Sequence, residues 1–487
     1  MFKCSQHMKN LTGPCFSNTI SITRNQNVLA QEKVIDNAMK SLAEIPKPKS
    51  LPILGTFLDY TKFEGFEVGN IAEFYKSRFE HLGPIFKENI LPGLTDMTVY
   101  CSSPQDNETM FRTEGKLANR DPIAVLKFSR EKLGIPTGLV NIQGEEWYTL
   151  RKIVNKHFLS NSSVWSYDKE LHEVSDDFVE YISQNLDSNN EVPNFRLALN
   201  KWALEGAGTF CLDTRFGMFS EKTDENLQLI VDNTALLFDL LTELNFAPPV
   251  WRYFETKKIK ALKKCQAVQL EAISKQRDRM MEKVKHKNDK DLTKLEILVT
   301  KKDLPDSEVA ILISDMLGGG VDTTSNAAAF MLYVLAINPE KQEILREEIK
   351  NALQSDKVDG MSLQRMKYLH ACVLEAQRMF PLTVGTTRRL LQDTILSGYL
   401  VPKGTKVIML SNVMNGQNPA YFEDPETYLP ERWLQRNPNI KFAMTGSFGI
   451  GARACPGRKF AMQEVHYLLI SVLSRFKLQY NYKPIKA

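Results

Sequence analysis

The fold of this chain is constrained most strongly by residues 307–337, which read SEVAILISDMLGGGVDTTSNAAAFMLYVLAI. This stretch is apolar almost throughout rather than on one side. A helix that is apolar on all sides is buried in the centre of a large domain. Glycines and polar residues interrupt the run and argue against a membrane span. The chain has 487 residues, of which 43% are hydrophobic, so it can supply such a domain.

Most of the remaining chain has the 3.6-residue spacing of apolar positions that predicts helices. Short runs at 85–90 and 96–101 are typical of strands, and 394–410 reads as a hairpin around glycine-containing turns. The fold class is therefore mainly α with a small β region. We expect further helices at 68–83, 145–159, 197–212, 226–246, 262–285, 339–354 and 370–380.

Composition limits the partners and the compartment. The net charge of +4, from 62 basic and 58 acidic residues, is too balanced to indicate nucleic-acid binding. Residues 1–31 contain no Asp or Glu, which is typical of an organellar transit peptide; a disordered tail is the alternative. Prolines within 45–56 mark the start of folded structure. We therefore divide the chain into a transit peptide or tail at 1–44 and a single domain at 45–487.

A second stretch, FGIGARACPG at 448–457, surrounds one cysteine with glycines and an arginine. Cys455 has no C-x-x-C partner, so the alternatives are a buried structural thiol, one ligand of a zinc or iron–sulfur site, or a lone thiolate that holds haem iron. Glycines let the backbone bend and approach a flat ligand, and Arg453 adds a permanent cation. These neighbours favour the lone thiolate. The 7 cysteines lie far apart, which argues against a disulfide framework, at positions 4, 15, 101, 211, 265, 372 and 455.

The long apolar helix contains an unusual segment, GGGVDTT, at 318–324. Each glycine costs roughly 1 kcal/mol relative to alanine, and threonines can bond back to the backbone and bend the helix. Close helix packing is one explanation. The acid and hydroxyls that follow the glycines favour a local widening that holds a small ligand against a flat cofactor. There Thr323 could donate a hydrogen bond to dioxygen, and Asp322 could relay protons.

Together, these two stretches resemble the cysteine loop and the oxygen-activation segment of the cytochrome P450 family, whose members are haem-thiolate monooxygenases. The resemblance begins at LPILGT, 51–56, and extends to the helix after Cys455. It implies the cytochrome P450 fold, in which a long central helix lies over haem b and the cysteine loop lies beneath it. It also implies that Cys455 is the axial ligand and that Phe448, Gly449 and Gly457 of the loop bind the haem.

Two more sets of residues acquire roles from this resemblance. Glu375 and Arg378 in EAQR, with Arg432 in PERW, match a buried cluster that supports the cysteine loop. Charges buried together require mutual pairing, whereas an isolated Glu–Arg pair of this spacing would be a surface bridge. The second set would bind the haem propionates or, alternatively, be solvated surface residues. It comprises Trp147, Arg151, Arg453 and Arg388, with Arg389 as a rival to Arg388.

Among the classes of this family, the animal mitochondrial type is the most similar. It takes electrons from a [2Fe–2S] ferredoxin, with its reductase, on the matrix side of the inner membrane. KWALEGAGTF around Trp202 and the basic pair Arg458 and Lys459 resemble that class, and the pair would bind the ferredoxin. His370 and Leu374 depart from it, because that class usually has lysines there.

The substrate is expected to be a lipophilic small molecule, such as a sterol, an ecdysteroid-like hormone or a xenobiotic. The apolar stretches 117–140 and 233–246 would cover the distal side of the haem and roof the pocket. A haem-binding protein without monooxygenase activity and a microsomal-type monooxygenase are the alternatives.

The basic run 257–264 follows an apolar FAPPVW and is either a solvated face or a peripheral membrane contact. The chain ends at Ala487, short of the terminal hairpin usual in the family.

Overall fold

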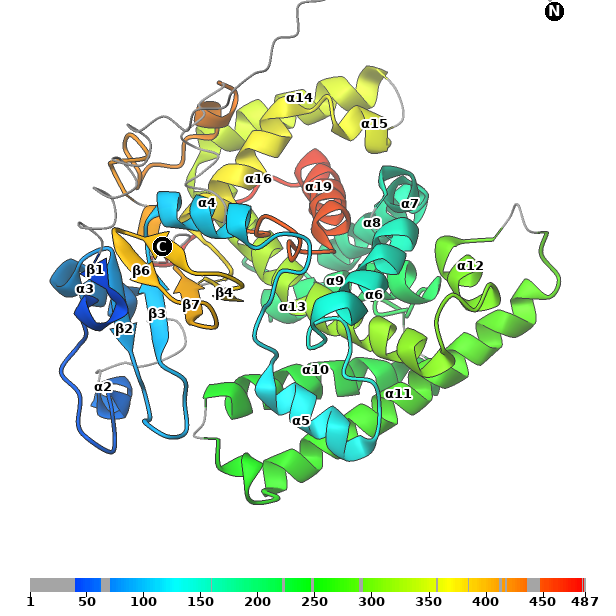
Figure 1. Ribbon diagram of the computed structural model, residues 1–487. Coiled ribbons are helices and arrows are strands. Elements are labelled where there is room, and N and C mark those ends of the chain that lie inside the picture. The colour runs from blue at the N-terminus through cyan, green and yellow to red at the C-terminus, as the bar shows by residue number, and fades with distance from the viewer. Residues whose placement is uncertain are drawn as a thin grey trace, which may run out of the picture.

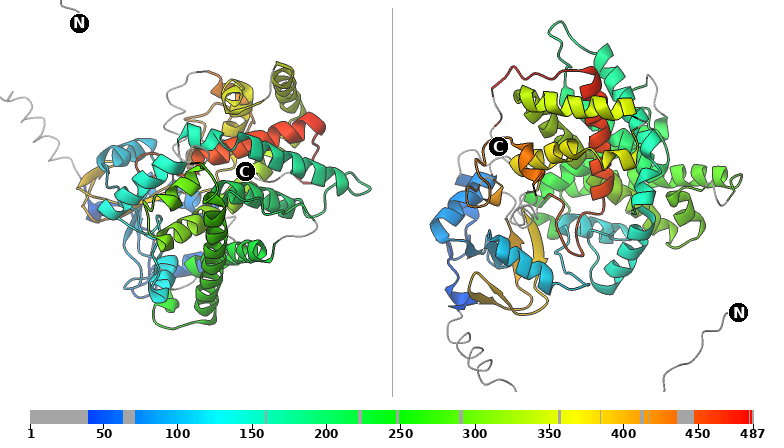
Figure 2. Two further views of the ribbon diagram at one scale, coloured as in Figure 1. Left: turned by 90° about the vertical axis from the view of Figure 1, so that its right-hand side faces the viewer. Right: turned by 90° about the horizontal axis from the view of Figure 1, so that it is seen from above.

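The computed structural model describes a helical body with two small sheets on one side of it (Figure 1; Figure 2). The mainly α class predicted from the sequence is confirmed. None of the helices that the structure describes combines the length and the apolar character needed to cross a membrane. The described residues are 40–62, 71–158, 160–220, 224–246, 249–288, 292–355, 358–383, 385–410, 414–416, 418–435, 447–483 and 485.

Helices occupy each stretch whose spacing predicted them. The long apolar stretch forms a single helix, α13, and α9 packs along it. The helices are α2 (Phe57–Lys62), α3 (Ile71–Leu82), α4 (Pro104–Thr113), α5 (Ala124–Leu133), α6 (Gly144–Phe158), α7 (Asn161–Trp165), α8 (Asp168–Gln184), α9 (Phe195–Leu212), α10 (Glu225–Phe246), α11 (Lys257–Val284), α12 (Lys294–Thr300), α13 (Asp306–Ile337), α14 (Pro339–Ser355), α15 (Gly360–Leu363), α16 (Lys367–Met379) and α19 (Arg458–Arg475). Three short 3-10 turns are η1 (Leu42–Glu44), η3 (Val250–Arg252) and η5 (Pro430–Trp433).

Local signals in the sequence account for several helix ends. The Thr256 side chain accepts a hydrogen bond from the Ile259 backbone N–H and so begins α11. Thr293 and Glu296 form a reciprocal capping box at the start of α12. At the other end of α5, Gly134 adopts the left-handed conformation with φ 67°, which ends a helix without strain when the residue is glycine.

The strands form two sheets. In the first, β1 (Lys40–Ser41) pairs with β6 (Tyr399–Val401), which pairs with β5 (Thr394–Leu396). In the second, the order is β2 (Ile85–Glu88), β3 (Thr98–Cys101), β7 (Lys406–Met409) and β4 (Thr386–Arg389). The β3 and β7 strands are parallel, with Val99 opposite Val407.

Two expectations about these strands need adjustment. The stretch 394–410 is not one hairpin: β5 and β6 form a hairpin, whereas β7 belongs to the other sheet. The turn before β7 bonds back to Leu390, which directs the chain into the second sheet. Described structure also begins at β1, ahead of the predicted domain start at Ile45. The rest of the predicted transit peptide lies outside the described residues.

The main hydrophobic core is built around α13 from the helices that pack on it. It includes Trp147 of α6 and Trp202 of α9, which are 2% and 0% exposed. The last helix, α19, contributes a nearly continuous buried segment to the same core. Because the loop 448–457 leads directly into α19, burial of this helix places the cysteine loop near the middle of the molecule.

Candidate functional site

The cysteine loop is closed by its own backbone. The N–H of Cys455 donates to the Phe448 carbonyl at 2.7 Å. Gly449 and Gly451 have φ values of 68° and 78°, a left-handed conformation that suits glycine. A Cβ on Gly451 would also collide with the Glu114 carboxylate. These two glycines are therefore required by the loop, whereas Gly457, with φ −82°, is not required on this ground.

The sulfur of Cys455 lies at the start of α19 and is exposed, whereas the other cysteines of the described residues are buried. Burial of the sulfur's surroundings raises the pKa of the thiol above its usual range. Hydrogen bonds from the Gly457 and Arg458 N–H groups and the charges of Arg151 and Arg120 oppose this rise. The thiolate is thus partly stabilised by the chain, and a bound metal cation would complete its stabilisation.

The alternative of a zinc or iron–sulfur site finds no support in this region. Across the part of the chain that the structure describes, no three His, Cys, Asp or Glu side chains come together as a metal-binding group. Such sites in proteins are built from several ligands of these types. Cys455 is therefore a candidate for a single axial bond rather than for a shared cluster.

Three of the arginines predicted to bind propionates converge on one place. The Arg453 guanidinium lies 3.8 Å from the centre of the Trp147 ring and donates to the Ala118 carbonyl at 2.9 Å. Arg151, one turn after Trp147 on α6, donates to the Ala454 carbonyl at 2.8 Å and so ties α6 to the cysteine loop. Arg388 on β4 is 3% exposed, and it lies close enough to Arg453 for its charge to lower the pKa of Arg453.

The rival candidate, Arg389, has a different environment. Its guanidinium pairs with Asp121 at 2.9 Å and with Asp96 at 2.7 Å, close to the surface. Neighbouring residues of a strand point to opposite faces, so only one of the two arginines can face the cluster. That residue is Arg388.

A fourth arginine, Arg120, joins the cluster although the sequence analysis did not single it out. Burial and the charges of Arg120, Arg388 and Arg151 lower the pKa of Arg453 to about 9. Burial and Arg388 likewise lower the pKa of Arg120. The signal that could have found it was a basic side chain within the apolar stretch 117–140.

The arginine cluster, Arg120, Arg151, Arg388 and Arg453, is short of negative charge. Only Glu114 pairs with it, through Arg388, among the described residues. The Nε of Arg151 is buried without a hydrogen-bond partner in the same set of residues. Unpaired cations in a partly buried site attract anions. The two carboxylates of a haem would supply the missing charge, so these residues fit that group.

The predicted Glu–Arg–Arg cluster is present as a buried network. Glu375 and Arg378 on α16 pair at 2.8 Å, and both are at most 1% exposed. Arg432 of η5 donates from Nε to Glu375 at 2.9 Å. Trp433, which the sequence analysis missed, donates its indole N–H to the same carboxylate at 2.8 Å. Arg378 also donates to the Pro425 carbonyl, so the network joins α16 to the segment that precedes the cysteine loop.

One face of α13 is open although the helix is otherwise buried. Gly319 and Thr323, one turn apart, are both exposed, and the Thr323 hydroxyl donates to the Gly319 carbonyl at 2.7 Å. The helix is continuous through 318–324. This face is open because glycine has no side chain. The hydrogen bond between the Thr323 hydroxyl and the Gly319 carbonyl stays within the helix.

Asp322 faces a different direction from Thr323. It lines a cavity of about 390 Å³ between α9, α10 and α13, together with Lys201 and Asp232. Successive residues of an α-helix point about 100° apart, which explains the separation. Burial, with a contribution from Asp239, raises the pKa of Asp322, and Arg196 opposes this. The structure therefore places the two candidate catalytic side chains on adjacent faces rather than at one point.

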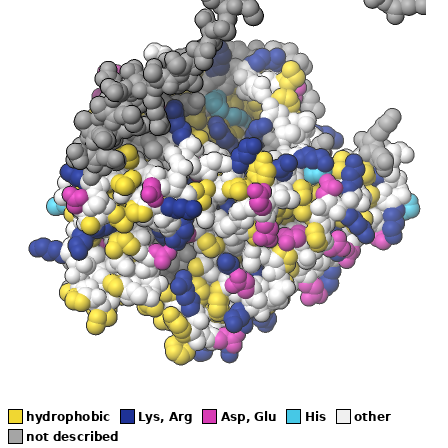
Figure 3. Space-filling view, in the orientation of Figure 1, with side chains coloured by type: hydrophobic (Ala, Val, Ile, Leu, Met, Phe, Trp, Pro, Cys, Tyr) yellow, Lys and Arg dark blue, Asp and Glu magenta, His cyan; other side chains and the backbone are white. Residues whose placement is uncertain are grey.

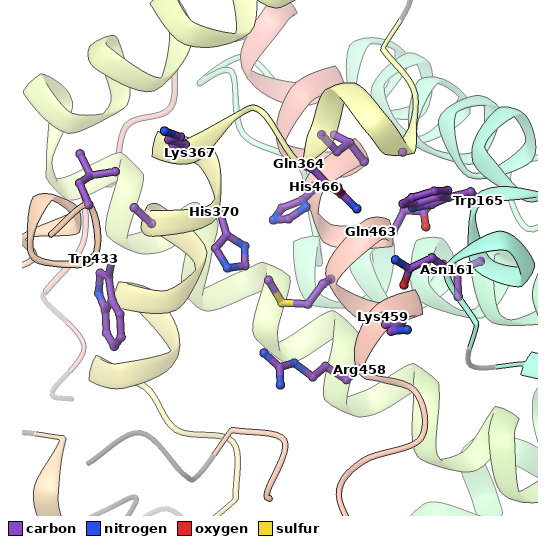
Figure 4. A pocket seen from close by; sticks show the side chains of 16 residues that line it. Asn161, Trp165, Gln364, Lys367, His370, Trp433, Arg458, Lys459, Gln463 and His466 are labelled. Carbon is purple, nitrogen blue, oxygen red and sulfur yellow. The ribbon is translucent and has the colours of Figure 1, made fainter. Parts of the chain in front are cut away.

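The basic pair Arg458 and Lys459 lines a hollow of about 540 Å³ between α16 and α19 (Figure 4). Lys367 and His370 of α16 reach the same hollow, and Lys367 was not foreseen. Leu374 is not among the residues that line it. We call this feature the proximal hollow, because Arg458 follows Cys455 by one helical turn.

Comparisons with known proteins agree with this geometry. The family profile described as Cytochrome P450 matches residues 45–486. The chain belongs to the cytochrome P450 family. It is 33% identical to "Cytochrome P450 10" of Lymnaea stagnalis, over 91% of this chain and 82% of that protein. It is 29% identical to "Cytochrome P450 CYP12A2" of Musca domestica, over 94% and 90%. It is 27% identical to "1,25-dihydroxyvitamin D(3) 24-hydroxylase, mitochondrial" of Rattus norvegicus, over 91% and 85%.

As a cytochrome P450, the protein is a haem-thiolate monooxygenase with haem b as its cofactor and a cysteine as the axial ligand. The exposed sulfur, the arginine cluster and the open face of α13 are what such a cofactor requires of a chain. The P450 fold predicted from the sequence is confirmed by the family match over nearly the whole of the described domain.

Proposed function

We propose that this P450 holds haem through Cys455 and hydroxylates a lipophilic substrate with electrons from a mitochondrial [2Fe–2S] ferredoxin. The reaction consumes one O2, two electrons and two protons; one oxygen atom enters a C–H bond and the other leaves as water. Bound haem supplies the dioxygen chemistry, and the chain supplies binding, orientation and protons. The observation that carries the proposal is an exposed thiol at a helix N-terminus beside a cluster of arginines short of anions.

The residues of α13 divide the work of proton delivery. A hydroxyl can rotate, so Thr323 can leave the Gly319 carbonyl and donate to a ligand on the open face of the helix. Asp322 faces the cavity between α9 and α10, where water can reach it. Its raised pKa makes it a better proton carrier near neutral pH than an ordinary aspartate. Asp322 takes up protons on one side of α13. On the other side, Thr323 positions the ligand that accepts its hydrogen bond.

The arginine cluster and the Glu375 network position the cofactor from two directions. Arg120, Arg151, Arg388 and Arg453 would hold the two propionates. The Glu375, Arg378 and Arg432 network would hold the segment that leads into the cysteine loop. Neither set of residues takes part in the reaction. Both would hold the Cys455 sulfur and the haem in fixed positions relative to each other.

Electron entry on the face that carries Arg458 and Lys459 is supported by their position. Both side chains are exposed, close to Cys455 in the chain, and without an ion-pair partner among the described residues. Opposite charges steer an acidic protein to such a face. The relative from rat that is named mitochondrial supports this class of electron donor and a matrix-side location.

A peripheral contact with the membrane is part of the same proposal. Val250, Tyr253 and Phe254 are exposed by 52%, 69% and 72% at η3 and just after it. The lysines that begin α11 follow immediately. Apolar side chains flanked by basic ones suit the interface of an anionic bilayer.

Reconstitution of the purified holoprotein tests the function. We expect reduction by an animal mitochondrial ferredoxin with its reductase, and a haem spectral shift with members of a panel of sterols, ecdysteroids and lipophilic xenobiotics. A microsomal flavoprotein reductase should not replace the ferredoxin. A protein that binds haem but consumes no electrons with any of these compounds would instead be the haem-binding alternative. Turnover with the flavoprotein alone would favour the microsomal type.

A further inference from the structure

The proximal hollow is basic and contains no acid. Its lining includes Lys367, Arg458 and Lys459, two histidines, and no Asp or Glu. None of the three cations forms an ion pair with another described residue. In the space-filling view, histidine side chains lie in a recess of this face with Lys and Arg side chains nearby (Figure 3). A concave surface with unpaired charge of one sign concentrates ions of the opposite sign.

A buried histidine at the back of the hollow lacks a partner. His466 of α19 is 7% exposed, and its Nε2 is buried with no hydrogen-bond partner among the described residues. Burial, and the charge of His370, lower the pKa of His466 to about 3, so its ring stays neutral. A neutral imidazole carries one N–H donor. A buried polar group without a partner costs about 1–3 kcal/mol, which a ligand in the hollow would relieve.

A second histidine stands at the mouth of the hollow. The His370 ring, from α16, lies 5.8 Å from the His466 ring and meets it edge-on at 69° (Figure 4). Burial and the charge of Arg458 lower the pKa of His370 below its ordinary value. The charged or titratable groups that line the hollow with it are Lys367 on its own helix and Arg458, Lys459 and His466 on α19.

The surroundings of His370 contain no acid that could already raise its pKa. Gln463 and Trp433, which also line the hollow, are uncharged. The carboxylate bonded to Gln463 is Asp168, which also accepts hydrogen bonds from the Gly360 N–H and the Tyr467 hydroxyl and is not part of the lining. His370 is therefore neutral at pH 7 in the free protein, and any anion that enters the hollow changes its charge balance.

We propose that the proximal hollow receives a carboxylate side chain of the acidic electron donor, and that docking transfers a proton from solvent to His370. The proposal rests on the proposed function, because it concerns the same ferredoxin. His466 donates its N–H to the entering carboxylate, and protonated His370 pairs with it. The lysines usual at positions 370 and 374 are absent, so this chain replaces one permanent charge by a titratable one.

The direction of the pH effect follows from linkage. In the free protein the pKa of His370 is low, and a carboxylate beside it raises that pKa. At a pH between the pKa of His370 in the free protein and its pKa in the complex, His370 takes up a proton on docking. The affinity for the ferredoxin therefore rises as the pH falls. One linked proton changes the dissociation constant by at most about tenfold per pH unit. Arg458, Lys459 and Lys367 keep their charge over this range, so their contribution depends on salt and not on pH.

Calorimetric titration of the holoprotein with an animal mitochondrial [2Fe–2S] ferredoxin tests the proposal. Titrations at pH 7 in two buffers with different heats of ionisation measure the protons taken up. We expect a fractional uptake for the wild type, and a dissociation constant about three- to tenfold lower at pH 6 than at pH 8 at fixed ionic strength. His370→Gln should bind more weakly with no uptake and little pH dependence. His370→Lys should bind tightly at both pH values, again with no uptake.

Controls separate this inference from the proposed function. His81→Gln changes an exposed histidine at the end of α3, far from the hollow, and should behave as the wild type. Proton uptake that persists in His370→Gln overturns the inference, as does binding by the wild type without uptake. In both cases the proposed function would still stand if the ferredoxin binds in a salt-sensitive manner and if reversing the charges of Arg458 and Lys459 abolishes this binding. No binding of the ferredoxin at all would overturn both.

Discussion

At the scale of single residues, the properties of Cys455 come from its surroundings. Two N–H groups at the start of α19 and two nearby arginines favour the thiolate, while burial disfavours it. The side chain itself is unremarkable in type; seven cysteines occur in the chain, and the others among the described residues are buried. The reactivity of this thiol is therefore a property of its position.

Replacing this thiol tests its role as the axial ligand. Cys455→Ser removes the thiolate, and a serine oxygen cannot donate charge to iron in the same way. We expect the absorption band that thiolate ligation gives the reduced carbon monoxide complex to disappear. Cys265→Ser is the matched control, since a serine there can still donate to the Asn233 carbonyl. A thiolate-type band that survives in Cys455→Ser would identify another ligand.

The Thr323 hydroxyl should affect the use of electrons more than binding. Thr323→Ala removes the only hydroxyl on the open face of α13 that the structure describes at this turn. We expect an unchanged substrate-induced spectral shift, a fall in product formed per electron consumed, and more hydrogen peroxide. Thr323→Ser keeps the hydroxyl and should restore most of the ratio. Equal ratios in Thr323→Ala and the wild type would remove Thr323 from the mechanism.

Arg120 should contribute to cofactor retention because it belongs to the arginine cluster. Arg120→Gln removes one of the cations, and we expect faster loss of haem to an excess of an apo-globin acceptor, by about tenfold, with little change in the position of the carbon monoxide band. A tenfold faster loss corresponds to about 1.4 kcal/mol less activation free energy for haem release. The control is Arg112→Gln, which changes an exposed arginine of α4 whose only ion-pair partner among the described residues is Glu108. Equal loss rates for the two variants would exclude Arg120 from the cofactor site.

At the scale of elements, α16 and η5 act as one support because they share a buried charge network. Glu375 accepts from Arg378, Arg432, Trp433 and the Leu429 N–H. A buried carboxylate with this many donors is well stabilised, and each donor depends on it in turn. The network fixes the spacing between α16 and the segment that leads to the cysteine loop.

Neutralising Glu375 should cost far more than neutralising a surface acid. Glu375→Gln leaves two buried arginines without a counter-charge, at about 3–5 kcal/mol. We expect little soluble, haem-loaded protein, measured as haem content per mole of purified chain. Glu343→Gln is the matched control, because Glu343 and Arg346 have the same spacing on α14, but the Glu343 side chain is 58% exposed. Normal haem content in Glu375→Gln would show that the network does not support the site.

At the scale of the whole molecule, the fold separates the proposed face for electron entry from the proposed membrane contact. The basic pair and the proximal hollow lie between α16 and α19. The exposed apolar side chains at η3 immediately precede α11 in the chain, and α11 lies apart from α16 and α19 (Figure 1). The proposed ferredoxin and the proposed membrane contact therefore do not compete for the same surface.

Charge reversal of the basic pair tests this arrangement. Arg458→Glu with Lys459→Glu should slow the first electron transfer from the ferredoxin by at least about tenfold at low salt and weaken its salt dependence. Turnover with added peroxide, which needs no protein partner, should change little. Lys47→Glu with Lys49→Glu reverses two exposed lysines near the sheets and serves as control. Unchanged reduction in the first variant would place the electron donor elsewhere.

The sequence by itself determined the fold class, the positions of many of the helices and the central motifs, because these depend on local periodicity and on residues close together in the chain. The apolar run of α13, the glycines at 449 and 451 and the pair Glu375 and Arg378 belong to this group. The local sequence also predicted that β7 is a strand, but it did not predict which of the two sheets β7 joins.

Only the tertiary structure decided which distant residues share a site. Arg120 and Trp433 joined their clusters because loops far apart in sequence pack together, and no spacing rule links them to Arg453 or Glu375. The same holds for the hollow, where Lys367, His370 and His466 meet from two helices. Charges interact over a few ångströms of space whatever their separation along the chain. Their effects on the site therefore became visible only once the helices were placed.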